Sequence, residues 1–155
     1  MEVVVYAVMG KSKYDLLNFS YKDSAGTDVF ASFYYKRYIE ERGQKVKLVY
    51  FIPHEIEGEV LKILDDAKAA IEYDAMWEHV LIPSYGYSDT GNFRYETTYR
   101  YIAFTMLMRF LIDINEHRKT LKKVVIDSSL GWNLYLSAML DSIRTASVMW
   151  NLFHY

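Results

Sequence analysis

The chain contains no cysteine and has no excess of basic residues. The absence of cysteine excludes disulfide bonds, zinc sites built on thiolates and cysteine nucleophiles. Lysine and arginine number 18 against 20 aspartate and glutamate residues, which gives a formal net charge of −2. A protein that binds duplex DNA needs a basic excess to neutralise phosphates. The composition therefore argues against duplex DNA as a partner, whereas a smaller anion held by local groups fits it.

Long apolar runs are also absent. No stretch reaches the roughly 18 uninterrupted apolar residues of a membrane-spanning helix, and no basic flank precedes the apolar run at the amino terminus. We therefore expect a soluble, cytoplasmic protein with no membrane partner. The four histidines are scattered and none lies at metal-ligand spacing from another, so we expect no metal site. No motif calls for a cofactor.

The chain has 155 residues, of which 52% are hydrophobic and 25% charged. This length and composition predict one globular domain spanning residues 1–155. The chain stops where a further strand is expected, which predicts a truncated chain or one that lacks an effector domain.

Apolar runs alternate with segments of helical periodicity. The runs predict strands buried on both faces at Val3–Gly10, Lys45–Ile52, His79–Ile82 and Lys122–Asp127. Helical spacing predicts helices from Thr27 to Gly43, Glu59 to Ile71, Tyr95 to His117 and Trp132 to Phe153. The order predicts an α/β fold with a doubly wound, mostly parallel, Rossmann-like sheet and helices on both faces.

Two local features add detail to this pattern. The polar segment Lys11–Gly26 is long for a connection, and its part YDLLNFSY fits either a hairpin strand or an irregular loop. In the third helix, Arg109 precedes Asp113 by four residues, the spacing of an ion pair along a helix surface.

In a doubly wound sheet, ligands bind beyond the carboxyl ends of the strands where the strand order reverses. This rule selects the loop that begins at Gly10 and the loop from Asp127 to Asn133. The tripeptide Gly10, Lys11, Ser12 ends like a phosphate-binding loop, but the first glycine of that signature is missing. The first loop therefore offers a glycine and a lysine suited to an anion, and the alternative is that Lys11 and Lys13 are merely solvated.

The second loop, within the stretch IDSSLGWN, combines a carboxylate, hydroxyls, a glycine and an amide before a helix. Unpaired N–H groups at a helix amino terminus suit a phosphate. The alternative is that Ser128 or Ser129 is an ordinary N-cap and Gly131 an ordinary turn residue. Ser129 is a poor candidate nucleophile, because Asp127 stands where the Gly-x-Ser-x-Gly motif needs its first glycine. We predict no catalytic residue.

The last predicted helix carries a broad apolar belt that ends in WNLFHY, more than one covered face needs. Such a belt predicts a buried symmetric contact, most simply a homodimer.

The order of elements resembles the CARF domains, the CRISPR-associated Rossmann-fold domains of type III CRISPR systems, and most of all those of CARF-HEPN ribonucleases. The similar residues are the polar, aromatic-rich segment after Gly10, Ser24 and Thr27 at the expected start of the first helix, and DSSLGWN after the fourth strand. The segment IPSYGY, residues 82–87, is similar to the family's loop after strand three.

This resemblance implies a sensor of cyclic oligoadenylate in antiviral defence, in which a homodimer binds one ring across its twofold axis. It implies that the ligand-binding residues are Gly10, Lys11, Ser12, Ser24, Thr27, Ser128, Ser129, Gly131 and Asn133. The Arg-x4-6-His motif of the family's ribonuclease domain is absent, so no ribonuclease activity is expected of this chain. Two alternatives stay open: a ring nuclease that cleaves the cyclic ligand, and an interaction domain without a nucleotide ligand.

Overall fold

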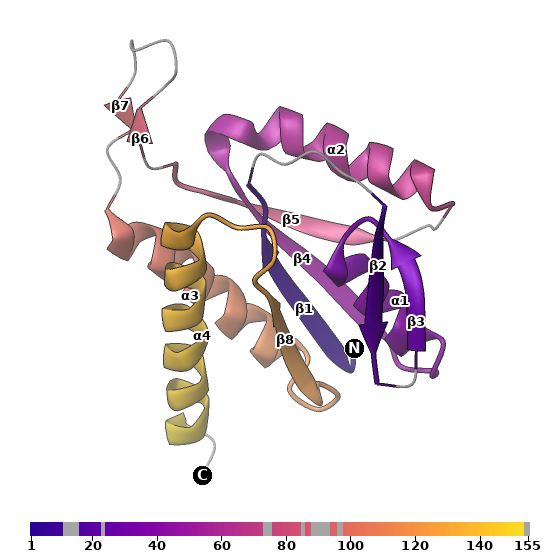
Figure 1. The fold of residues 1–155 in the computed structure, drawn as a ribbon. Helices are drawn as coiled ribbons and strands as arrows, with labels where there is room; N and C mark the ends of the chain where they lie inside the picture. Colours follow the sequence, from indigo (N-terminus) through magenta and orange to yellow (C-terminus); the bar gives the residue numbers. More distant parts are fainter. Residues whose placement is uncertain are drawn as a thin grey trace.

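A four-stranded parallel sheet forms the centre of the molecule, with the strand order β5-β4-β1-β8 (Figure 1). This computed structural model describes residues 1–10, 16–22, 24–72, 76–84, 86–87, 94–95 and 98–153. The sheet strands are β1 (Val3–Val8), β4 (Val46–Pro53), β5 (Trp77–Ile82) and β8 (Lys123–Asp127). Two antiparallel pairs lie apart from it: β2 (Leu17–Tyr21) with β3 (Ser24–Asp28), and β6 (Gly86–Tyr87) with β7 (Arg94–Tyr95).

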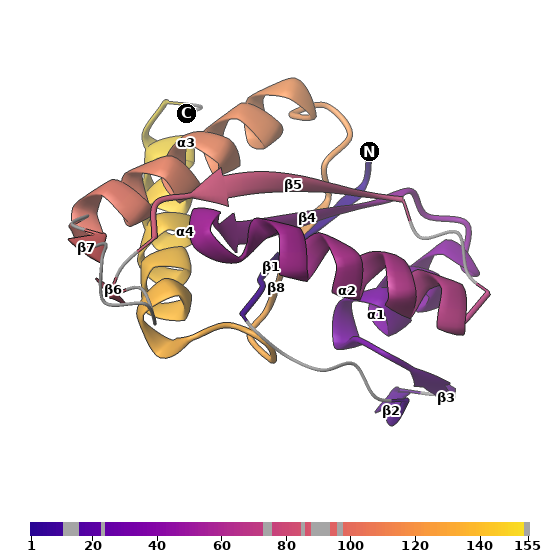
Figure 2. The same cartoon turned by 90° about the horizontal axis from the view of Figure 1, so that it is seen from above.

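The helices cover both faces of this sheet. They are α1 (Ala31–Glu40), α2 (Glu57–Ala70), α3 (Tyr99–Glu116) and α4 (Asn133–Phe153), and a 3-10 turn, His54–Ile56, precedes α2. Figure 2 shows α1 and α2 on one side of the strands and α3 and α4 on the other. The predicted α/β, doubly wound, Rossmann-like fold is confirmed.

Alternation of side chains along β1 produces two hydrophobic cores. Val3, Val5 and Ala7 face α1 and α2, whereas Val4, Tyr6 and Val8 face α3 and α4. Every residue from Val3 to Val8 is at most 2% exposed. A strand buried in this way is expected in the interior of a parallel sheet that helices cover on both sides.

The first helix starts later than the sequence predicts. Thr27 belongs to β3, where it pairs with Asn18 of β2 and its hydroxyl donates a 2.9 Å hydrogen bond to the Asn18 side chain. The helix begins at Ala31, and its N-cap residue, Phe30, makes no side-chain capping bond. The prediction that Ser24 and Thr27 start this helix is wrong, because hairpin pairing uses the backbone of Ser24–Asp28. Of the two interpretations of YDLLNFSY, the hairpin strand is confirmed over Leu17–Tyr21.

An ion network around the buried carboxylate of Asp113 joins α3 to three strands of the sheet. The carboxylate of Asp113, in a residue 1% exposed, accepts hydrogen bonds from the Tyr6 hydroxyl (2.7 Å), Lys47 Nζ (3.0 Å) and Arg109 Nε (2.7 Å). Glu78 on β5 forms ion pairs with Lys47 and Arg109. The sequence predicts the Arg109–Asp113 pair on a helix surface, whereas in the structure this pair faces the interior of the molecule.

These hydrogen bonds determine the protonation of Asp113. Burial raises the pKa of its carboxyl, but the hydrogen bonds from Tyr6, Arg109 and Lys47 outweigh burial and hold the pKa below the ordinary value of 3.8. Burial and the neighbouring Asp113 carboxylate raise the pKa of the Tyr6 hydroxyl far above its ordinary value, so that it stays a donor. The network is thus an ionised carboxylate with donors on three elements.

We expect Asp113→Ala to lower the free energy of unfolding by about 3–5 kcal/mol, because it leaves two cations without their buried acceptor. Urea denaturation followed by circular dichroism measures this change. The matched control is Asp66→Ala on the exposed side of α2, for which a change within about 0.5 kcal/mol is expected. Equal effects of the two substitutions would contradict the role assigned to the network.

The lowered pKa of Asp113 also predicts a pH dependence. A carboxyl whose pKa is lower in the folded state stabilises the protein above its unfolded value, here 3.8, and this contribution is lost as the pH falls through the folded value. The free-energy difference between the unchanged protein and Asp113→Asn should therefore be largest near neutral pH and shrink below about pH 4. Urea denaturation from pH 7 to pH 3 tests this, and a constant difference would contradict it.

Candidate ligand site at the carboxyl edge of the sheet

The strand order reverses between β1 and β8. From β1 the chain adds β4 and β5 on one side, and it then returns to place β8 on the other side (Figure 1). All four strands of this sheet run in parallel. The loops that follow β1 and β8 therefore leave the same edge as neighbours, at the position where open α/β sheets bind ligands.

The two loops are in contact at Gly10. Its backbone N–H donates to the carbonyl of Leu130 at 3.2 Å. A Cβ atom built on Gly10 would lie 3.0 Å from that carbonyl oxygen and 3.0 Å from Nε1 of Trp132. A side chain at this position would push the loop after β8 away, so glycine permits the contact.

Gly131 fits closely against the protein itself. A Cβ atom there would lie 2.8 Å from Cδ2 of Leu136 and 3.0 Å from Cβ of Val8. Packing of Val8 and Leu136 therefore explains the absence of a side chain at Gly131.

The loop after β8 begins with a local turn rather than a helix cap. Oδ1 of Asp127 accepts hydrogen bonds from the backbone N–H of Ser129 (2.9 Å) and from its hydroxyl (2.6 Å). The helix α4 begins at Asn133, so the interpretation of Ser128 or Ser129 as its N-cap is wrong. Ser129, four residues before the helix, is hydrogen-bonded to the Asp127 carboxylate. The side chains of Ser128 and Asn133 are exposed.

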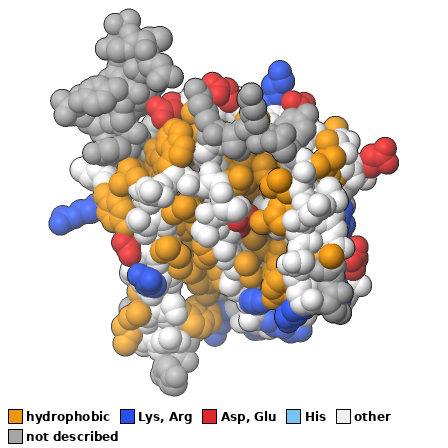
Figure 3. All heavy atoms as spheres, viewed as in Figure 1, with side chains coloured by type: hydrophobic (Ala, Val, Ile, Leu, Met, Phe, Trp, Pro, Cys, Tyr) orange, Lys and Arg blue, Asp and Glu red, His pale blue; other side chains and the backbone are white. Residues whose placement is uncertain are grey.

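A cavity of about 290 Å³ extends from this turn along the α1 side of β8. Val5, Val125 and Ile126 supply apolar lining from the sheet, and Asp127, Ser128 and Ser129 line the cavity where β8 ends. Residues of β2 and the first residues of α1 complete the described lining, with four aromatic rings among them: Phe19, Ser20, Tyr21, Ala31, Ser32, Tyr34 and Tyr35. Figure 3 shows apolar side chains gathered between α4 and the β2–β3 hairpin, over β8.

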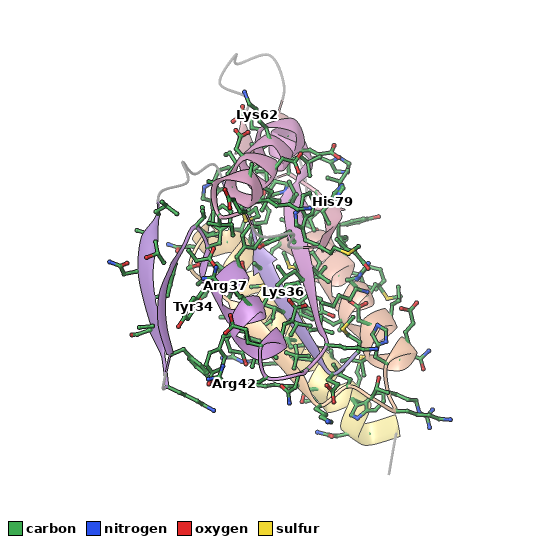
Figure 4. The ribbon with its side chains drawn as sticks, turned by 90° about the vertical axis from the view of Figure 1, so that its right-hand side faces the viewer. Tyr34, Lys36, Arg37, Arg42, Lys62 and His79 are labelled. Atoms are coloured by element: carbon green, nitrogen blue, oxygen red, sulfur yellow. The ribbon has the colours of Figure 1, made fainter. Side chains whose placement is uncertain are left out.

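Aromatic contacts and one arginine hold the hairpin against α1. The ring of Phe19 stacks on that of Tyr34 with centroids 5.6 Å apart, and Tyr21 meets Tyr35 edge to face at 5.4 Å. Arg37 donates to the carbonyl of Thr27 at 3.1 Å. Figure 4 shows Tyr34 and Arg37 on the side of α1 that faces the hairpin. The cavity therefore has a fixed aromatic wall.

Ser32, which lines the cavity, also takes part in a buried polar contact between α1 and β4. The hydroxyls of Ser32 and Tyr50 share a 2.7 Å hydrogen bond, and burial raises the pKa of Tyr50, so both stay neutral. Burial likewise raises the pKa of Asp28, although its ion pair with Arg37 at 3.1 Å opposes that shift. The described lining residues include hydroxyls, rings and one carboxylate, but no cation and no histidine.

The predicted site residues divide into four groups. Gly10 and Gly131 lie in the two joined loops, with Asn133 directly after them as the first residue of α4, and Ser128 and Ser129 border the cavity. Ser24 and Thr27 lie in β3, and Thr27 does not line the cavity. Lys11 and Ser12 fall outside the described residues.

The aromatic wall was not among the predicted site residues. Its signal was present in the sequence, as the aromatic residues of YDLLNFSY precede the aromatic helix segment SFYYKRY. Only pairing of the first segment as a hairpin brings the two together.

One acidic cluster has the composition of a metal site. Ligand atoms of Asp113, Glu116 and His117 lie within 4.8 Å of one another. The Asp113 carboxylate already accepts hydrogen bonds from two cationic side chains and from Tyr6. A metal ion would have to displace them, so this cluster is better suited to its structural role.

Comparisons with known proteins leave the family open. No protein-family model matches the chain, and a search of curated proteins gives no match. The resemblance to CARF domains therefore stays a prediction. Over the described residues, none of the helices is both long and apolar enough to span a bilayer.

We expect Gly131→Ala to destabilise the fold by about 1–3 kcal/mol, because the new methyl group overlaps Val8 and Leu136. Gly58→Ala in α2 is the matched control and should not destabilise the fold. A Cβ atom there meets nothing within 4 Å, and alanine favours the helix over glycine by about 0.5–1 kcal/mol. Thermal unfolding of both variants checks this. A Gly131→Ala protein as stable as the parent would show that the loop yields freely.

Proposed function

We propose that this chain is a ligand-sensing domain that binds a cyclic oligoadenylate as a homodimer and catalyses no reaction on it. The observation that carries the proposal is the contact between the loops after β1 and β8, through Gly10 and Leu130, at the reversal of strand order. Both loops are those in which the sequence resembles CARF domains.

The groups at the site can bind phosphate without a basic side chain. Phosphate oxygens accept hydrogen bonds from hydroxyls and from backbone N–H groups. Ser128 is exposed directly after β8, and Asn133 is exposed at the start of α4. The first N–H groups of a helix are unpaired and carry partial positive charge. This accounts for anion binding by a chain with a net charge of −2.

The aromatic wall supports the nucleobase part of the proposal. Adenine presents a flat π-face, and base–aromatic stacking contributes about 1–3 kcal/mol per base. Phe19, Tyr21, Tyr34 and Tyr35 border the cavity beside Ser128 and Ser129. An adenine in the cavity would contact aromatic rings on one side, and the serine hydroxyls would lie at the rim of the cavity.

Roles for Lys11, Ser12, Ser24 and Thr27 stay predictions of the resemblance. The ring-nuclease alternative would need a group that positions the ribose hydroxyl or stabilises charge on the phosphate. Among the described residues, the cavity lining holds no cation that could stabilise charge on the phosphate. We favour sensing over cleavage because the sequence offers no base or metal site to accompany Lys11.

Incubation with radiolabelled cyclic tetra-adenylate or hexa-adenylate separates the alternatives. Retention of the intact ring on the protein is the expected result. Conversion to linear fragments would overturn the non-catalytic part of the proposal. Absence of both would overturn the ligand assignment and favour an interaction domain.

We expect Ser128→Glu to raise the dissociation constant of the ring at least about tenfold, equivalent to about 1.4 kcal/mol, because it puts a carboxylate beside a phosphate. Thr145→Glu adds the same charge at an exposed hydroxyl position on α4, away from the two loops, and should leave affinity nearly unchanged. Isothermal titration calorimetry measures both. Equal losses would mean that total charge, not this loop, controls binding.

A further inference from the structure

Two apolar helix faces do not supply the contact between copies that the proposed function needs. The apolar belt that the sequence suggests on α4 mostly packs inside the molecule, through Tyr135, Ala138, Met139 and Ala146. The exposed apolar side of α3 lies on the side of the sheet opposite the candidate cavity. A contact that brings two cavities together must therefore use another surface.

The outer edge of β8 is open. This strand ends the strand order of the sheet, and over the described residues it pairs with β1 and with no other strand (Figure 1). The residues from Val124 to Asp127 are half-buried, whereas those of β1 are at most 2% exposed. Helices lie on both sides of the sheet, so the exposed surface of β8 lies along its free edge.

Backbone groups of Val124 and Ile126 face this open edge. The N–H of Lys123 donates to the carbonyl of Glu2, on the side of β1. Residues along a strand direct their N–H and C=O groups to alternate sides, so the groups of Val124 and Ile126 point outward. Such a row of unpaired groups is a template for another strand.

Unfilled space borders β8 on both faces. The cavity of the candidate site lies on the α1 side, where Val125 and Asp127 are among its lining residues. A second cavity, of about 300 Å³, lies on the α3 and α4 side, and Val124, Ile143 and Trp150 are among its lining residues. Successive side chains of an added strand point to the two faces in turn. One added strand would therefore direct side chains toward both cavities.

The sequence KVVID of β8 is complementary to itself in the antiparallel direction. Pairing about Val125 puts Lys123 opposite Asp127 of a second copy, and Val124 opposite Ile126. In this register the outward groups of Val124 exchange both backbone hydrogen bonds with those of Ile126. Opposite charges that face each other across antiparallel strands stabilise the pair, and like charges destabilise it.

We propose that β8 is the strand through which two copies of this chain pair, antiparallel and centred on Val125. A second copy is the occupant because β8 itself offers the charges and the outward backbone groups that its copy needs. Figure 3 shows apolar side chains on both sides of β8, from α4 to the β2–β3 hairpin, so the apolar surface is wider than the strand alone.

This inference rests on the homodimer of the proposed function and deepens it by joining two half-sites. A twofold axis beside Val125, perpendicular to the sheet, keeps the α1 sides of both copies on one face of the joined sheet. Val125 lines the cavity and lies next to this axis, so the two cavities become neighbours.

The second copy also supplies the cation that the described cavity lining lacks. Lys123 directs its Nζ to the α1 side, where it donates to the Tyr35 hydroxyl at 3.0 Å. In the paired strands this lysine lies opposite Asp127 of the other copy, at the end of β8 where Ser128 and Ser129 border the cavity. A phosphate at that rim would have hydroxyls from one copy and an ammonium group from the other.

Light scattering after size exclusion, without ligand, tests the pairing. The unchanged chain should have about twice its mass of 18.3 kDa at micromolar concentration. Lys123→Asp and Asp127→Lys each oppose like charges at both ends of the paired strands, so each alone should raise the dimer dissociation constant at least about tenfold. An equimolar mixture of these two variants restores opposite charges and should form the dimer. Lys62→Asp, at an exposed position of α2, is the matched control and should stay dimeric.

Single cysteines test the register, since the chain has no cysteine of its own. Val125→Cys puts each thiol beside its copy, in a non-hydrogen-bonded pair whose Cα atoms lie about 4.5 Å apart, within the range of a disulfide. Oxidation with copper phenanthroline should give a covalent dimer on a non-reducing gel. Val124→Cys is the matched control, because Val124 lies opposite Ile126, and it should be linked at least about tenfold more slowly.

Circular dichroism verifies that each variant is folded, and the cysteine pair decides if a charge variant is not. A monomeric parent chain, charge variants as dimeric as the parent, a mixture that stays monomeric, or equal linking of the two cysteine variants overturns the inference. Binding of cyclic tetra-adenylate and hexa-adenylate is measured separately. A dimer paired through β8 that binds neither ring overturns the proposed ligand alone, and a monomer that binds one overturns the pairing alone.

Discussion

Burial of β1 on both faces is the constraint on which the other elements depend. Hydrogen bonds along both edges join it to β4 and β8, and its alternate side chains start the two hydrophobic cores. Helices must then cover both faces, because apolar side chains on either face would otherwise meet water. The same central position puts the reversal of strand order, and with it the candidate site, directly at the end of β1.

The one polar side chain inside β1 connects this constraint to the Asp113 network. Tyr6 points its hydroxyl into the α3 and α4 layer, where a buried hydroxyl without a partner costs about 1–3 kcal/mol. Asp113 accepts that bond, and Lys47 and Arg109 neutralise the carboxylate. The network fixes how α3 lies on the sheet, and therefore which of its two apolar sides is left facing solvent.

The ion network and the candidate site thus lie at different ends of the sheet. The ion network involves Lys47 and Glu78, near the starts of β4 and β5, whereas the joined loops lie at the opposite edge. At that edge, two glycines allow close packing of the loops, and hydroxyls and aromatic rings surround a cavity. A site made from loops and backbone groups can change its side chains with little effect on the core.

The sequence by itself determined the four strands of the sheet, the four helices apart from their exact starts, and the edge of the sheet at which the candidate site lies. Continuous apolar runs and helical spacing are local signals, and a parallel order follows from their alternation. Only the tertiary structure decided that Thr27 belongs to a hairpin, that Arg109 pairs with a buried Asp113, and that one apolar side of α3 is exposed. Periodicity shows which sides of an element are apolar, but which of them is covered depends on residues distant in the chain.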